Sequence, residues 1–280
     1  MSDTTFSPIP TLILTPTGVI STPYRVPSLA AAVSLEPEGV YTVARTFCGD
    51  RALLLDAHLD RLEESARLSG IPLELDRDRL RAALRDALHA AGYPDAKFRI
   101  TVPRDDPSRL YLALEPYQPV PEVVMRDGAH VVTLPITRAN PVVKTTAWMT
   151  VRKPSQESLP PGVYEGILRS PDGRLLEGLS SNFYAVLDGV LYTAGEGVLA
   201  GITRRAVLEI AADLLPVRPE APYDRDVPRF EEALLTSSGR GVVPITRIDG
   251  QPIGEGAVGP IARTLRERYD RWAETHSEPI

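Results

Sequence analysis

Strands follow one another along most of this chain without a helix between them, and this order constrains the fold more than any other feature. In the segments KFRITVPR and RLYLALEPY, β-branched and aromatic residues lie on either side of the turn-forming DDPS. Helical spacing interrupts the strands in few places, most clearly in two consecutive segments between residues 56 and 92. Runs of strands and runs of helices, rather than strict alternation, predict the α+β class.

The first part of the chain predicts a small α+β domain over residues 1–118. TLILT and GVYTVARTF are rich in β-branched and aromatic residues, as strands are. Two amphipathic helices follow, and Gly70 and Gly92 are placed to end them.

The rest of the chain predicts a larger, sheet-rich and barrel-like domain over residues 127–280. Residues 119–126 contain two prolines in a polar context and predict a linker between the domains. Beyond the linker, hairpin-ordered strands outnumber the helices, which are expected near residues 203–215 and 261–274.

Composition excludes several classes of function. The 280 residues carry a net charge of -6, which does not favour binding to nucleic acid or to an acidic membrane surface. No apolar run approaches the roughly 20 residues that span a bilayer, and the N-terminus does not resemble a signal peptide, so we expect a cytoplasmic protein. One cysteine and four scattered histidines predict no metal site.

Lys144 lies in NPVVKTTAW, an apolar, strand-like segment that follows an Asn-Pro turn. One interpretation is structural, because a lysine on an edge strand discourages pairing between sheets. The other is chemical, because desolvation lowers the pKa of a lysine and frees its amine to attack a carbonyl. The local sequence leaves both interpretations open.

Two clusters of glycine and hydroxyl residues have the composition of phosphate sites. VLAGITRRAV places Gly201 and Thr203 at the start of a helix, and TSSGRG precedes a strand. Each can be an ordinary cap or turn, with Thr203 closing the first helical turn, or a set of donors for an anion. Glu177, at the start of EGLSSNFYAVLDG, adds a carboxylate. A lysine for an aldehyde, donors for a phosphate and a carboxylate for a pyridinium nitrogen together suit pyridoxal 5′-phosphate.

The order of these motifs resembles the class IV, or fold-type IV, aminotransferases. This family includes D-amino-acid aminotransferase, branched-chain aminotransferase and aminodeoxychorismate lyase. Lys144 is followed by EGLSSNFYAVLDGVLYT, LAGITR and TSSGRGVVPITRIDG in the family's order, and HLDRL matches its HxxRL helix. The resemblance extends over residues 36–272 and implies a two-domain fold and a homodimer.

The resemblance also implies which residues bind the cofactor. Lys144 is the catalytic residue that binds the aldehyde, and Glu177 pairs with the pyridine nitrogen at the separation from Lys144 that is typical of the family. Ser180 helps to shape the turn beneath the ring, and Leu199 supports the ring face. The remaining cofactor-binding residues implied for that turn and for the phosphate are Arg61, Ser181, Asn182, Gly201, Ile202, Thr203, Ser238 and Gly239. Without the resemblance, Arg61 would be interpreted as part of a solvated helix face.

A further set of residues is expected to face the substrate. GVYTVARTF most resembles the strand of D-amino-acid aminotransferase, and a period of two places Tyr41, Val43 and Arg45 on one face. RDDPSRLYLAL can be aligned with that enzyme's carboxylate-binding turn, with Arg109 at the arginine position and Tyr111 where a histidine is usual. The alternative for Arg109 is a solvated hairpin residue. D-amino acids are therefore favoured as donors, followed by branched-chain L-amino acids.

One segment departs from the family pattern. After the lysine the family continues into a long amphipathic helix, whereas TTAWMTVRKPSQESLPPG carries Pro154, Pro160 and Pro161, which predict a break in it. Trp148 and Arg152 lie in this segment. Arg152 is either a ligand for the substrate carboxylate or a surface arginine.

The function predicted is therefore a pyridoxal-phosphate aminotransferase that passes nitrogen from an amino acid to a 2-oxo acid. Two alternatives remain open. One is aminodeoxychorismate lyase, which uses the same scaffold and lysine to eliminate pyruvate. The other is a non-catalytic protein that binds the cofactor.

Overall fold

The computed structural model describes residues 7–280 and divides into two compact units. Unit 1 comprises the described residues up to Gln118, together with Val143–Val151 and His276–Ile280. Unit 2 comprises Pro119–Val142 and Arg152–Thr275. Both units combine a largely antiparallel sheet with helices, so the α+β class is confirmed. Within the described part of the chain, no helix is long and apolar enough to cross a membrane.

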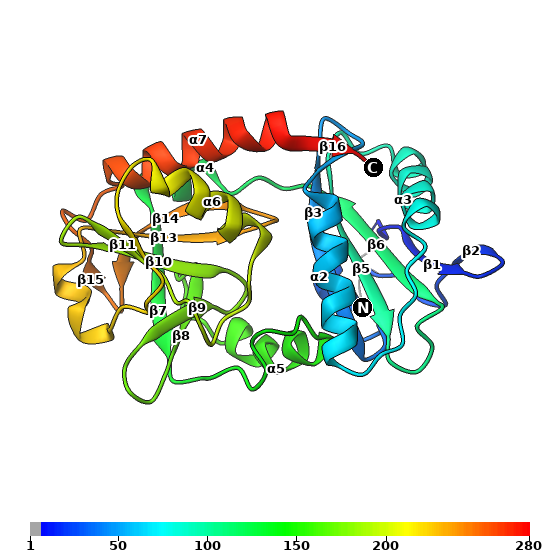
Figure 1. The fold of residues 1–280 in the computed structure, drawn as a ribbon, viewed down its shortest axis with the longest axis horizontal. Coiled ribbons are helices and arrows are strands. Elements are labelled where there is room, and N and C mark those ends of the chain that lie inside the picture. The colour runs from blue at the N-terminus through cyan, green and yellow to red at the C-terminus, as the bar shows by residue number, and fades with distance from the viewer. Residues whose placement is uncertain (1–6) are drawn as a thin grey trace, which may run out of the picture. The chain divides into compact units, whose positions relative to one another are not determined.

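Unit 1 contains a seven-stranded sheet in the order β16-β4-β3-β5-β6-β1-β2, with helices α2 and α3 on one face (Figure 1). Its elements are β1 (Thr11–Thr15), β2 (Gly18–Ser21), α1 (Leu29–Ala32), β3 (Gly39–Phe47), β4 (Arg51–Leu53), α2 (Leu55–Leu68), α3 (Arg77–Ala91), β5 (Ala96–Pro103), β6 (Leu110–Pro116) and β16 (Ser277–Pro279). Helix α5 (Thr146–Glu157) begins within the segment Val143–Val151.

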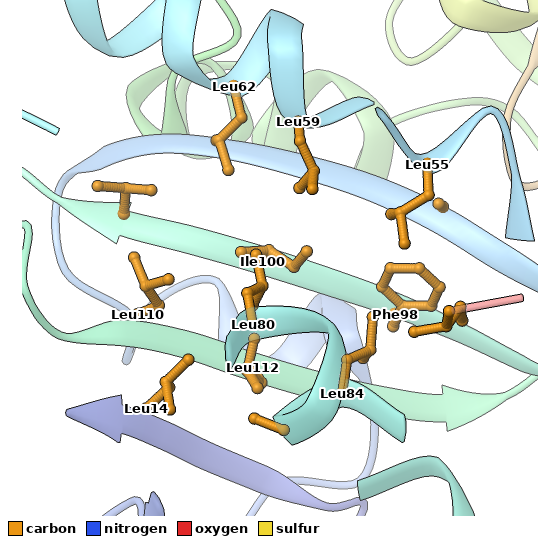
Figure 2. Packing of buried hydrophobic residues seen from close by; sticks show 14 of the residues in the cluster. Leu14, Leu55, Leu59, Leu62, Leu80, Leu84, Phe98, Ile100, Leu110 and Leu112 are labelled. Atoms are coloured by element: carbon orange, nitrogen blue, oxygen red, sulfur yellow. The ribbon is translucent and has the colours of Figure 1, made fainter. Parts of the chain in front are cut away.

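The core of unit 1 forms because the apolar faces of α2 and α3 cover alternate residues of the sheet. Leu55, Leu59 and Leu62 recur at helical spacing on α2 and point toward Phe98 and Ile100 of β5 (Figure 2). All five side chains are at most 1% exposed. Burying an aliphatic or aromatic side chain of this size stabilises a fold by roughly 1.5–3 kcal/mol, so this face holds α2 on the sheet.

The ends of α3 explain why the sequence predicts this helix well. Asp76 occupies the N-cap and accepts a hydrogen bond from Arg79 N at 3.0 Å. Gly92 ends the helix with a φ of 66°, a left-handed conformation that glycine adopts without strain.

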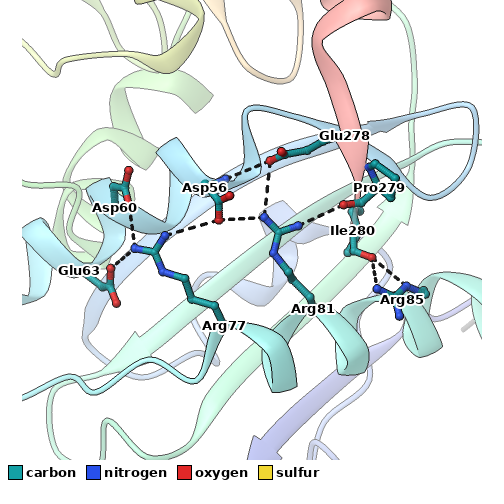
Figure 3. A network of polar contacts seen from close by, with 9 residues as sticks. All are labelled: Asp56, Asp60, Glu63, Arg77, Arg81, Arg85, Glu278, Pro279 and Ile280. Atoms are coloured by element: carbon teal, nitrogen blue, oxygen red, sulfur yellow. Dashed lines mark hydrogen bonds and ion pairs between the residues drawn. The ribbon is translucent and has the colours of Figure 1, made fainter.

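The C-terminal strand completes unit 1 through contacts that local sequence does not reveal. β16 pairs antiparallel with β4, and the Ile280 side chain is buried in the core. Arg81 donates to Pro279 O at 3.1 Å and Arg85 Nε donates to Ile280 O at 2.8 Å (Figure 3). Residues 276–280 therefore belong to unit 1, although the sequence placed them in the larger domain.

Unit 2 is built around strands that close on themselves. Its elements are α4 (Glu122–Asp127), β7 (Ala129–Leu134), β8 (Glu165–Arg169), β9 (Leu175–Gly178), β10 (Asn182–Leu187), β11 (Val190–Tyr192), α6 (Ile202–Ala212), β12 (Val217–Arg218), η1 (Asp224–Arg229), β13 (Glu232–Ser237), β14 (Gly241–Ile248), β15 (Gln251–Pro252) and α7 (Pro260–His276). The strands run β10-β13-β14-β7-β8-β9, and a β9–β10 pairing at Asn182 and Glu177 closes this row. A barrel-like sheet thus places Glu177 at its seam.

The structure corrects the expectation of a linker over residues 119–126, and it corrects the expected helix break at Pro154 but not at Pro160 and Pro161. Residues 119–126 are not an extended linker, because Pro121 takes the N-cap of α4, where a missing N–H costs nothing. Likewise α5 continues through Pro154 to Glu157, and Ser158 N donates to Pro154 O at 3.0 Å. Pro154 removes one donor near the end of that helix without ending it.

Candidate active site

Glu177 is a buried carboxylate with partners of its own in unit 2. It is 3% exposed and lies on β9 beside Asn182 of β10. One oxygen accepts a hydrogen bond from Leu199 N at 3.1 Å, and the other lies 3.4 Å from Arg138 Nη1. A guanidinium and a backbone N–H are partners that favour the charged form of a carboxylate. No motif points to Arg138, which stands in an irregular segment 39 residues from its partner.

Asn182 fixes the loop that leads into α6. Its Nδ2 donates to Leu199 O at 2.9 Å. The same side chain passes close to Gly201, where an added Cβ would lie 2.2 Å from Asn182 Oδ1. A residue with a side chain at Gly201 would therefore displace this amide, and the loop needs glycine here.

The N-terminus of α6 has the properties of an anion site. Gly201 is the N-cap and has no side chain to accept from the first turn, which also contains no acidic residue. The backbone N–H groups there carry partial positive charge and lack intrahelical partners. Thr203 is not the cap that the sequence offered as one interpretation. It is the second helical residue, buried, with Oγ1 at 3.5 Å from Ser238 Oγ.

These unit 2 groups fit pyridoxal 5′-phosphate. Ser181 Oγ is buried and has no hydrogen-bond partner among the residues that the structure describes, which is unusual for a hydroxyl. Leu199 and Ile202 add apolar surface at 9% and 7% exposure. A pyridine ring has an apolar face and one basic nitrogen, and its phosphate suits an uncapped helix N-terminus. Unit 2 thus brings together Glu177 and its polar neighbours with the two predicted phosphate turns.

Lys144 lies in unit 1 and is not on a strand as expected. It follows a turn and directly precedes the bridge residue Thr145, which pairs with Val40 of β3. Its backbone is fixed on both sides, since Tyr41 N donates to Lys144 O at 3.0 Å and Lys144 N donates to Ser65 Oγ at 3.2 Å. Its ammonium lies 4.6 Å from the centroid of the Tyr41 ring, within cation–π range.

Arg61 shares a buried polar cluster with Thr42 and His58. Arg61 Nη2 donates to Thr42 Oγ1 at 3.4 Å, and the same hydroxyl lies 2.9 Å from His58 Nδ1. Burial lowers the pKa of His58 well below its usual value, and the charges of Arg61 and Lys144 lower it further. His58 is therefore a neutral imidazole at pH 7. The half-buried Arg61 is not a purely solvated helix residue.

The predicted substrate residues of unit 1 share one face of the sheet. Tyr41 pairs with Thr101 of β5, which in turn pairs with Tyr111 of β6, so the three side chains lie in one row. Val43 and Arg45 follow Tyr41 on that face because strand residues alternate. This shared face agrees with the period-two expectation.

The arginines of this face differ in how far their donors are used. Arg99, opposite Val43, is 3% exposed and holds Glu36 through Nε at 2.8 Å and Nη2 at 2.5 Å. Arg45 is stacked on Phe47 and Tyr117, with its guanidinium carbon 4.1 and 4.3 Å from the ring centroids. Within residues 7–280, the buried Nε of Arg45 has no hydrogen-bond partner.

Arg109 has an available donor as well. It stands at the end of the β5–β6 turn, where its backbone N donates to Asp106 O at 3.1 Å. Its Nε is also buried without a partner in the described structure. Arg45 and Arg109, unlike Arg99, thus each have a buried Nε–H without a partner among the described residues.

The residues of the proline-containing segment have partners within the protein. Trp148 is 7% exposed, and Lys153 lies on the surface beside Glu157. Arg152 is half-buried and donates to Leu179 O at 2.8 Å, so it is neither a free surface arginine nor an isolated one.

Comparison with known proteins agrees with this chemistry. The family model for class IV aminotransferases matches residues 39–248. A putative branched-chain-amino-acid aminotransferase of Methanocaldococcus jannaschii is 28% identical over 251 residues, or 83% of this chain and 86% of that protein. D-alanine aminotransferase of Staphylococcus aureus is 39% identical over 104 residues, which cover 36% of this chain and 37% of that protein.

Solved structures share the fold. A crystal structure of a T.th. branched-chain amino acid aminotransferase with pyridoxamine 5′-phosphate matches with a TM-score of 0.81 at 22% identity. The match covers 97% of this chain and 96% of that one. A putative branched-chain amino acid aminotransferase from Thermotoga maritima matches with a TM-score of 0.77 at 23% identity, over 94% of this chain and 96% of that one.

Proposed function

Because the chain belongs to the class IV aminotransferase family, we propose that it transfers an amino group from an amino acid to a 2-oxo acid with pyridoxal 5′-phosphate as cofactor. When bound, this cofactor holds the donor's nitrogen covalently and withdraws electrons from its Cα. The observation that carries the proposal is Glu177, a buried carboxylate that has a guanidinium and a backbone N–H to keep it charged.

We propose that Glu177 binds the protonated pyridine nitrogen. A full negative charge at this point favours the pyridinium form, and Arg138 keeps that charge in place. Leu199, whose N–H also binds Glu177, would face the ring, and Ser181 Oγ would find its partner on the cofactor.

The phosphate would be held by the N-terminus of α6 and the turn after β13. Ile202 and Thr203 offer backbone N–H groups and a hydroxyl, and Ser238 and Gly239 supply the second turn. The resemblance to the family implies Arg61 as a further phosphate ligand.

Lys144 would hold the cofactor aldehyde and act as the proton carrier. With the cofactor bound, the Lys144 amine would move a proton between Cα of the substrate and the cofactor carbon C4′. The backbone contacts to Tyr41 and Ser65 fix the base of this side chain.

We infer that the donor is a D-amino acid, held by its α-carboxylate on the face of the sheet that carries Tyr41. Arg109 and Arg45 have unused donors there, and Val43 supplies apolar contact. The local identity with D-alanine aminotransferase supports this donor, while the longer match to a branched-chain enzyme supports L-amino acids as the second candidate. We further infer a homodimer in the cytoplasm, which sedimentation and cell fractionation would test.

A half-reaction screen tests the proposal. The holoenzyme is mixed with single D- or L-amino acids without a 2-oxo acid, and the cofactor's absorbance is followed. We expect conversion to the aminated cofactor with D-alanine or D-glutamate. Conversion by L-leucine alone would show that the donor is an L-amino acid and would leave the proposed aminotransferase activity standing. Release of pyruvate from aminodeoxychorismate, without conversion by any amino acid, would favour the lyase.

A further inference from the structure

A buried ion pair in unit 2 joins two turns that are far apart in the sequence. Glu165 on β8 is 3% exposed, and its Oε2 accepts a hydrogen bond from Arg240 Nη1 at 2.6 Å. The two residues are 75 positions apart, and the sequence alone assigns a role to neither. One turn runs from Gly178 to Ser181, directly after Glu177, and the other runs from Ser237 to Arg240.

The first turn is held at Leu179, whose N donates to Gly166 O at 2.9 Å and whose O accepts from Arg152 at 2.8 Å, and at Ser180. The backbone N–H and the hydroxyl of Ser180 both donate to Glu165 Oε1, at 2.6 and 2.9 Å. Arg240 Nη2 lies 3.2 Å from Ser180 O and 2.9 Å from Ser180 Oγ. The pair therefore binds every polar group of this residue and fixes where the turn lies.

The second turn is held by the same arginine. Arg240 Nε donates to Ser237 Oγ at 3.0 Å, and Arg240 N donates to Ser237 O at 3.1 Å. Ser238 and Gly239 lie between these two residues in the sequence. One guanidinium thus contacts both turns, and its planar arrangement of donors fixes them at one separation.

We propose that Glu165 and Arg240 form a positioning clamp that sets the separation between the ring-binding and phosphate-binding turns of the cofactor site. The inference rests on the proposed function, because it takes Glu177 as the ring contact and Ser238 as the phosphate contact. Two contacts on one ligand reinforce each other only when their spacing matches the ligand. The clamp therefore makes the phosphate group strengthen binding of the whole cofactor.

An apolar contact would hold the two turns less specifically. Burial alone raises the pKa of Glu165, but the charge and hydrogen bond of Arg240, together with Ser180, hold that pKa below its usual value. Such a pair adds little stability over apolar residues of similar volume, yet its hydrogen bonds fix direction and distance. Stability and positioning can for this reason be separated by mutation.

The test compares cofactor affinity with and without the phosphate. Apoenzyme is dialysed against pyridoxal 5′-phosphate and against pyridoxal, and the ratio of the Kd for pyridoxal to the Kd for the phosphate form gives the contribution of the phosphate. The variants are R240K, which keeps charge but loses the planar fork, R240M, which leaves Glu165 without its cation, and E165Q/R240M, which removes both charges and keeps an acceptor for Ser180 N–H. The exposed pair Asp188 and Arg229 supplies the control D188N/R229M. Thermal unfolding of each protein is measured in parallel.

We expect R240K and E165Q/R240M to lower the Kd ratio about tenfold, with the Kd for pyridoxal within about threefold of wild type. R240M alone should unfold at a lower temperature, and the double variant should recover this loss because no charge is left buried alone. The control should leave the ratio unchanged. A double variant that recovers both stability and the Kd ratio would show a purely structural pair and overturn the clamp.

Two other outcomes are also decisive. Equal losses of affinity for both ligands would mean that the pair supports the ring-binding turn only, and the clamp would be wrong. A wild-type protein that binds neither ligand would instead overturn the proposed function, on which the clamp depends. The wild-type measurement therefore distinguishes the two failures.

Discussion

Units 1 and 2 present their candidate site residues in different ways. In unit 2 the groups are backbone N–H groups, short hydroxyls and one carboxylate, fixed by the seam at Glu177, the N-terminus of α6 and the Glu165–Arg240 pair. In unit 1 they include several long side chains, such as those of Lys144, Arg45 and Arg109. Short groups in a bonded network have one position, whereas long side chains can adapt.

Because of this difference, the two units suit different kinds of ligand. Unit 2 suits a ligand that stays the same in every turnover, as a cofactor does. The donors left unused on Arg45 and Arg109 suit a ligand that changes, as substrates do. Apart from Arg61 and Lys144, which the proposal also places on the cofactor, mutations in unit 1 should accordingly alter substrate affinity, and those in unit 2 should alter the cofactor's binding and reactivity.

The largest effect should come from the unit 1 lysine. Lys144→Ala removes the proton carrier, and we expect kcat to fall by about 10²–10⁴-fold or more. Lys153→Ala is the matched control, because this exposed lysine lies nearby on α5. Single-turnover kinetics with the preferred amino acid measure the loss. Normal turnover in the Lys144 variant, with loss in the Lys153 variant, would move the catalytic role to Lys153.

A smaller effect is expected from the unit 2 carboxylate. Glu177→Gln keeps the shape and the acceptor for Leu199 N but loses the charge that favours the pyridinium form. Hydrogen bonds to charged groups contribute about 1.5–3 kcal/mol, so we expect kcat to fall about 10- to 100-fold with the cofactor still bound. Turnover equal to wild type at saturating substrate would contradict the assignment of Glu177.

The sequence predicts those parts of the molecule whose determinants are local. The strand over residues 39–47 and the helix ending at Gly92 follow from a period of two and from a left-handed cap. The prolines misled because their effect depends on position within a helix. At the N-cap of α4 a proline removes a donor that the helix does not use, whereas α5 continues through Pro154 although it loses one backbone hydrogen bond there.

The residues of the candidate site can also be separated into those with local determinants in the sequence and those without. Glu177, Lys144 and the two phosphate turns could be found by the order of their motifs. The roles of Arg138, Glu165 and Arg240 could not, because each is a single charge whose partner lies 39 or 75 residues away. Only the closure of the unit 2 strands brings these charges together. A buried carboxylate without a nearby cation is the one signal in the sequence that could have prompted a search for them.

A third prediction tests the adaptable face of unit 1. Arg109→Ala should raise the KM for the amino acid by about tenfold, the value of one charge-assisted hydrogen bond, and leave cofactor affinity unchanged. Arg45→Ala is the comparison, because its guanidinium is stacked between rings on the same face. Steady-state kinetics with D- and L-donors measure both. A rise in KM confined to the Arg45 variant would assign binding of the carboxylate to Arg45. Unchanged KM values in both variants would show that this face does not bind the substrate.

The smallest effect concerns stability and lies in the polar cluster of unit 1. Thr42 has one hydroxyl proton, and Arg61 can only donate, so that proton is available to His58 Nδ1. Because the pKa of His58 is lowered on folding, the unfolded chain takes up a proton first as the pH falls below about 6.5. This contribution to stability is therefore complete above that pH and is lost below it, by at most about 1.4 kcal/mol per pH unit.

His58→Asn should flatten the decline in unfolding free energy between about pH 6.5 and 5.5, measured by urea unfolding, whereas His89→Asn on the exposed side of α3 should not. If the unfolding free energy had the same pH profile in the two variants, His58 would take up no extra proton on unfolding. The assignment of a neutral imidazole to His58 would then be wrong.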